Sequence, residues 1–117
     1  MTHQAPPSST PPSADPGRQV AQLREALRLV ERIAGRPESS SPEGRLDEAA
    51  RISDAYERAS PVAQRRFESL VAETALWAAA GVEAQLGAGN GALPRAAAER
   101  LALTLERTLN EMASLLR

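Results

Sequence analysis

The sequence predicts an all-α protein: a four-helix bundle-like domain with a long antiparallel helical hairpin at its C-terminal end and a disordered N-terminal tail. Apolar residues recur at spacings of three and four after residue 15, which is the period of an amphipathic helix. Helix start and stop signals divide this part of the chain into four segments, and no segment resembles a strand. Residues 16–117 are therefore expected to form a single helical domain.

The N-terminal segment, residues 1–15, is rich in proline, serine and threonine. Such a composition cannot bury enough apolar surface to offset the entropy of ordering, so disorder is expected there. A proline-rich recognition peptide is the alternative interpretation. No basic residue flanks the prolines, which favours a plain tail.

The first two helices are expected over 16–34 and 42–59. Asp15 precedes a proline and predicts an N-cap, Gly35 predicts a C-terminal stop, and Ser41 caps the second helix. The first helix has an unusually wide apolar side, formed by Val20, Leu23, Leu27, Val30 and Ala34 and widened by Ala26, Leu29 and Ile33. The second has a weaker stripe, formed by Leu46, Ala49, Ile52, Tyr56 and Ala59.

Two longer helices are expected over 61–86 and 92–117. Ser60 followed by a proline caps the first of them, and the glycine-rich run 87–91 cannot continue a helix. Each helix would be about 39 Å long at 1.5 Å per residue, and the short turn between them predicts the antiparallel hairpin. The last helix has one apolar stripe, formed by Ala98, Leu101, Leu105, Leu109, Met112 and Leu116.

The helix over 61–86 carries apolar residues on two sides. Its main stripe consists of Phe67, Leu70, Val71, Thr74, Ala78 and Val82, while the opposite side is formed by Ala72, Leu76, Ala79 and Ala80. With one residue each of Trp, Tyr and Phe, the core buries little area per residue. We therefore expect self-association through the second side, with Ala72, Leu76, Trp77, Ala79 and Ala80 as partner-binding residues. A core position is the alternative for Trp77.

Catalytic and metal-binding constellations are not found in the sequence. Cysteine and lysine are absent, and the single histidine, His3, falls in the tail. Carboxylates alone would have to carry acid–base chemistry, so we predict a protein that is not an enzyme and needs no cofactor or metal. The acidic residues Glu43, Asp47 and Glu48 are better explained by the positive end of a helix dipole than by magnesium or calcium.

Four arginines follow one side of the first helix at intervals of four residues. This ridge consists of Arg24, Arg28, Arg32 and Arg36. Guanidinium groups bind phosphate and carboxylate, so contact with phosphates or with an acidic partner is one interpretation. A solvated face partly neutralised by Glu25 and Glu31 is the other and is favoured, because no aromatic residue interleaves with the ridge.

The functional prediction is a non-catalytic protein–protein interaction module, an adaptor, scaffold or regulator that also self-associates. The alternative is a small nucleic-acid-associated regulator that uses the arginine ridge. A net charge of −1 and the lack of a long apolar run argue against a membrane partner, and no small-molecule substrate is indicated. The arginine- and alanine-rich composition is typical of a GC-rich bacterial genome, and a cytoplasmic location is expected.

Overall fold

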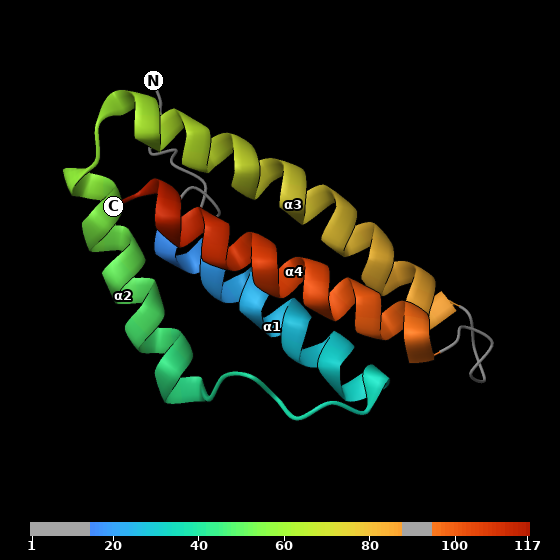
Figure 1. Cartoon of the computed structure of the whole chain (residues 1–117). Helices are drawn as coiled ribbons and strands as arrows, with labels where there is room; N and C mark the ends of the chain where they lie inside the picture. Colours follow the sequence, from blue (N-terminus) through green and yellow to red (C-terminus); the bar gives the residue numbers. More distant parts are fainter. Residues whose placement is uncertain (1–14, 88–94) are drawn as a thin grey trace, which may run out of the picture.

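The structure is a computed structural model that describes residues 15–87 and 95–117. Within these ranges it contains four α-helices and no strand, which confirms the all-α prediction. The helices are α1 (Pro16–Ala34), α2 (Pro42–Arg58), α3 (Pro61–Gly87) and α4 (Arg95–Leu115) (Figure 1). The predicted tail up to residue 14, the predicted turn after residue 87 and the predicted start of the last helix near residue 92 lie outside the described residues.

The helix starts are formed by the capping residues that the sequence predicts. Asp15, Ser41 and Ser60 each accept a hydrogen bond from a backbone N–H two or three residues further on, at 3.0 to 3.1 Å. These bonds satisfy amides that have no partner inside the first turn. Gly35 ends α1 with a φ of 73°, a left-handed conformation that favours glycine.

Helices α1, α3 and α4 all contact one another, whereas α2 packs mainly on one of them. In Figure 1, α4 runs beside α3 in the opposite direction, and α1 packs against both. Helix α2 packs mainly on α1 and contacts α3 only weakly. Its last turn is tethered to α3, because the ring of Tyr56 lies 5.8 Å from the ring of Phe67 and Gln64 donates a hydrogen bond to the Tyr56 carbonyl at 2.7 Å.

The core is formed mainly by the stripes predicted for the first and last helices. Its largest buried members are Phe67, Leu27, Leu105, Leu109, Met112, Val20 and Val30. On α3 the main stripe faces inward, with Thr74 also buried and its hydroxyl donating to the Leu70 carbonyl at 2.6 Å. None of the described helices is both long enough and apolar enough to cross a membrane.

The predicted burial of Leu46 is wrong, because this side chain is 72% exposed. Helix α2 packs mainly on α1, and Leu46 lies outside the contact between the two helices, whereas Ala49 and Ile52 of the same stripe are half-buried and buried. Leu46 instead borders a surface hollow with polar α1 residues such as Gln22 and Glu25. On α1, the widening residues Leu29 and Ile33 are likewise exposed.

Candidate interaction surface

One side of α3 is apolar and is not covered by the described part of the chain. Ala72, Leu76, Ala79 and Ala80, which we call the outer face of α3, are all exposed. Leu76 is 76% exposed, the largest exposed fraction among the large apolar side chains that the structure describes. Ala72 lies four residues before Leu76, and Ala79 and Ala80 lie three and four residues after it, so all four share one side of the helix and their exposed atoms form a continuous surface.

Trp77 lies at the edge of this face. It is half-buried and packs against the core, so part of the indole remains accessible. Nearby, Gly81 allows close contact between α3 and α4, because a Cβ at this position would lie 2.8 Å from a methyl carbon of Leu101. The core-facing side of α3 is therefore occupied by α4, which leaves the outer face pointing away from the chain.

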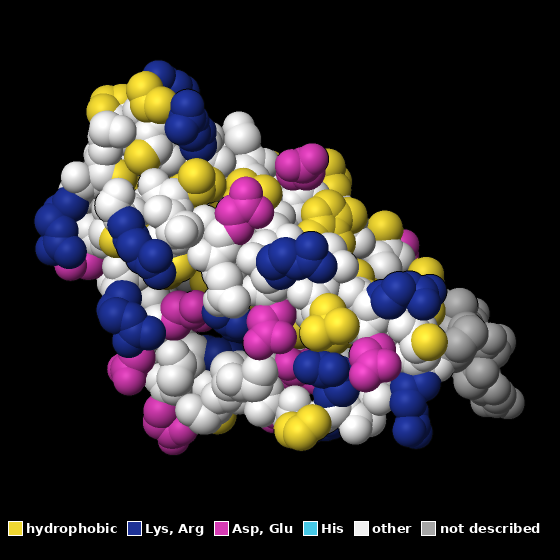
Figure 2. All heavy atoms as spheres, viewed as in Figure 1, with side chains coloured by type: hydrophobic (Ala, Val, Ile, Leu, Met, Phe, Trp, Pro, Cys, Tyr) yellow, Lys and Arg dark blue, Asp and Glu magenta, His cyan; other side chains and the backbone are white. Residues whose placement is uncertain are grey.

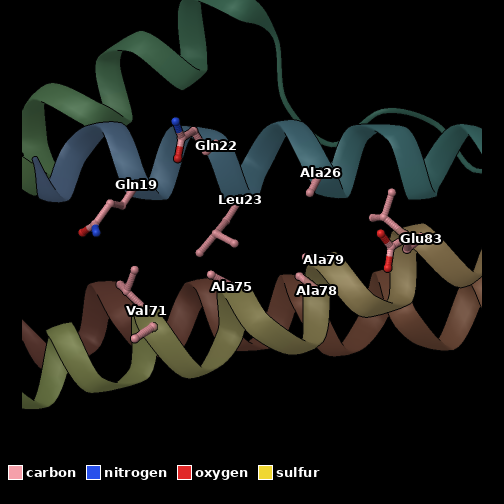
Figure 3. Close-up of a pocket in the computed structure, with 11 residues that line it drawn as sticks. Gln19, Gln22, Leu23, Ala26, Val71, Ala75, Ala78, Ala79 and Glu83 are labelled. Atoms are coloured by element: carbon pink, nitrogen blue, oxygen red, sulfur yellow. The ribbon is translucent and has the colours of Figure 1, made fainter. Parts of the chain in front are cut away.

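An apolar groove lies beside the outer face, between α1 and α3 (Figure 3). Its volume is about 460 Å³, and Ala72 and Ala79 belong both to its lining and to the outer face. Most of the remaining lining is aliphatic and comes from Leu23, Ala26, Val71, Ala75, Ala78 and Val82. Polar groups stand toward its ends, Gln19 and Gln22 at one and Glu83 at the other. In Figure 2, hydrophobic side chains follow the course of α3.

The sequence does not predict this groove. Its α1 wall includes Ala26, which the sequence places on the widened apolar side of that helix and therefore expects to be covered. The width of that stripe is the only signal for the groove. Periodicity identifies which side of a helix is apolar, but it does not give the distance between that side and the neighbouring helix.

The arginine ridge is extensively paired with carboxylates. Arg24 binds Glu48 of α2 through two nitrogens, each at 2.9 Å, and the two side chains are only 13% and 17% exposed. Arg28 binds Glu25 on the same helix and lies 3.6 Å from Glu38 in the following loop. These contacts use guanidinium hydrogens that a phosphate would otherwise accept.

The two remaining arginines of the ridge have weaker, more exposed partners. Arg32 lies 3.3 Å from Glu38, and Arg36 lies 3.5 Å from Glu99 of α4. The positive charge of the ridge is thus offset by carboxylates from α1, α2, α4 and the loop after α1. Contact of the ridge with phosphates or an acidic partner stays a prediction.

The contact between Glu25 and Arg28 shifts the pKa of both groups. The hydrogen bond from Arg28 holds the pKa of the Glu25 carboxyl below its ordinary value of 4.5, and the same contact raises the pKa of Arg28. Both groups stay charged near neutral pH. Glu31, predicted to neutralise the ridge from a solvated position, is instead buried and accepts a hydrogen bond from the Ser39 amide at 3.0 Å.

The described residues contain no group of three or more His, Cys, Asp or Glu side chains that could hold a metal ion. Of the acidic residues at the start of α2, Glu48 is already bound by Arg24. The outer face and its groove are therefore the candidate site. No protein-family model, curated protein or solved structure is significantly similar to this chain.

Proposed function

We propose that this protein is a non-catalytic interaction module, an adaptor, scaffold or regulator in the cytoplasm that binds other protein chains through the outer face of α3 and the adjoining groove. The proposal takes the domain to be a four-helix bundle-like unit in which α3 and α4 form an antiparallel hairpin. The observation that carries it is the exposure of Leu76 beside a groove with an apolar lining.

Free energy favours covering this surface. Burying a leucine side chain contributes about 1.5 to 3 kcal/mol, and the alanines around Leu76 add area without adding polar groups that would have to be desolvated. Alanine also lets a second backbone approach closely. A large apolar side chain with no role in the core of its own chain fits an interface anchor.

The shape of the groove favours a helix as the bound element. It lies between two helices, and its α3 wall extends from Val71 to Val82, about 17 Å at 1.5 Å per residue, or three helical turns. An amphipathic helix laid along it would place apolar residues on the alanine-rich floor. Its polar residues would meet Gln22 and Glu83 toward the ends.

A site-specific photo-crosslinking experiment tests the proposal. A photoreactive amino acid at Ala79 in the native cell should give a defined set of crosslinked proteins, whereas the same amino acid at exposed Glu57 of α2 should not. Purified crosslinked proteins should then bind the wild-type chain and lose about tenfold in affinity on Leu76→Gln.

Leu46→Gln is the matched control, because Leu46 is an equally exposed leucine on another helix. It should leave the affinity unchanged. Identical crosslinks from positions 79 and 57, or equal losses for the two leucine variants, would show that the outer face has no special role in binding.

A further inference from the structure

The outer face of α3 has a charged residue at each end. Arg65 lies toward the start of the helix and Glu83 toward its end, and both are exposed. Within residues 15–87 and 95–117, neither side chain forms an ion pair or a hydrogen bond with another residue. Glu68, one turn further along α3 than Arg65, accepts a hydrogen bond from the Tyr56 hydroxyl. The two charges are therefore available to a partner.

The spacing of these charges matches the helix period. Position 83 is 18 residues after position 65, which is about five turns and about 27 Å along the axis. Both charges therefore project from the same side of α3 as Leu76. Positions 65 and 83 are equidistant from position 74, and so are positions 72 and 76, which hold Ala72 and Leu76.

We propose that two copies of the chain pair through the outer face of α3, antiparallel, about a two-fold axis at the level of residue 74, on the side of the helix opposite the buried Thr74. This inference rests on the proposed function and names its first partner, a second copy. In this arrangement Leu76 of each copy packs on Ala72 of the other copy. Arg65 of each copy forms an ion pair with Glu83 of the other copy, at both ends of the interface.

A second copy fits because the surface is complementary to itself. A two-fold interface uses the same patch twice, so every residue needs its complement on the same patch. Here the large residue Leu76 meets the small residue Ala72, and Ser69 meets Ala79, which allows the two helices to approach within about 8 to 10 Å. The positive end meets the negative end, whereas a parallel pair would place like charges together.

Charge reversal tests both the pairing and its register. Sedimentation velocity over about 1 to 300 µM should show a dimer for the wild type. Arg65→Glu and Glu83→Arg should each weaken dimerisation about tenfold, because each variant places two like-charged pairs at the interface. An equimolar mixture of the two variants should regain the wild-type affinity, because the heterodimer has opposite charges at both ends.

Arg66→Glu is the matched control, since the next residue along α3 projects about 100° away from Arg65 and so away from Glu83 of the other copy. It should leave the dissociation constant unchanged, and circular dichroism should report a folded helix for every variant. A wild type that stays monomeric overturns this inference, while the crosslinking result at position 79 decides the proposed function separately. A wild-type dimer whose affinity is insensitive to Arg65→Glu, or a mixture that binds no better than its components, overturns the antiparallel register.

Discussion

The arginine ridge of α1 and the outer face of α3 are both regular stripes along a helix, yet they differ in what covers them. The ridge is paired with carboxylates from four parts of the chain, including Glu48 of α2 and Glu99 of α4. None of the helices in the described part of the chain covers the outer face, and Leu76 is 76% exposed on it. A stripe is available to another molecule only where no other part of its own chain already contacts it.

The difference arises because charged and apolar side chains need different kinds of contact. An arginine side chain can extend several ångströms to a carboxylate on a neighbouring helix, so a charged stripe can be satisfied without close packing. An apolar stripe is satisfied only by contact along its length. Helix α2 packs mainly on α1 and contacts α3 only through its last turn, so it does not cover the outer face.

The largest expected effect compares two leucines. Leu27 of α1 is 1% exposed and Leu76 is 76% exposed. Leu27→Ala should lower the free energy of unfolding by about 3 kcal/mol, because it leaves a cavity in the core, whereas Leu76→Ala should change it by less than about 0.5 kcal/mol. Urea unfolding at low protein concentration measures both. A loss of similar size at the two positions would mean that Leu76 is packed within its own chain.

A smaller effect is expected where the ridge meets α2. Glu48→Ala should cost about 2 kcal/mol of unfolding free energy, because it leaves Arg24 mostly buried without its carboxylate. Replacing both Arg24 and Glu48 by methionine should recover most of that loss, since no unpaired charge remains. Glu73→Ala, at an exposed position on α3, is the control and should be neutral. If Glu48→Ala were also neutral, the ridge would be as available to a partner as the outer face.

The features that could be predicted from the sequence depend on residues close together in the chain. The caps at Asp15, Ser41 and Ser60 are local, and so is the period of the stripes, so the starts of α1, α2 and α3 and most of the core followed from the sequence. The covering of each face depends on contacts between distant residues. Arg24 meets a residue 24 positions away and Arg36 one 63 positions away.

The same limit explains the errors and the omissions. The exposure of Leu46, the burial of Glu31 and the groove between α1 and α3 all depend on where neighbouring segments lie. None of the three could be predicted from periodicity alone. The residues of the outer face could be named in advance because α3 has two apolar sides, and one helix layer can cover only one of them.

The smallest expected effect is a pH dependence within the ridge. The pKa of Glu25 in the folded chain is below 4.5, its ordinary value, because Arg28 donates to the ionised carboxylate. A lowered folded pKa means that the contact stabilises the fold fully above 4.5 and loses this contribution as the pH falls through the lowered value. Glu25→Gln should therefore reduce the free energy of unfolding near neutral pH and make little difference in strong acid.

Urea unfolding across this pH range measures the difference between Glu25→Gln and the wild type. The difference should be small, because the Glu25 side chain is 45% exposed and water screens the pair. Glu57→Gln, at an exposed position on α2 outside any ion pair of the described residues, is the control and should show no such trend. A difference that stays constant or grows in acid would mean that Arg28 does not hold this carboxylate, and the ridge would then expose more positive charge to a partner than its contacts imply.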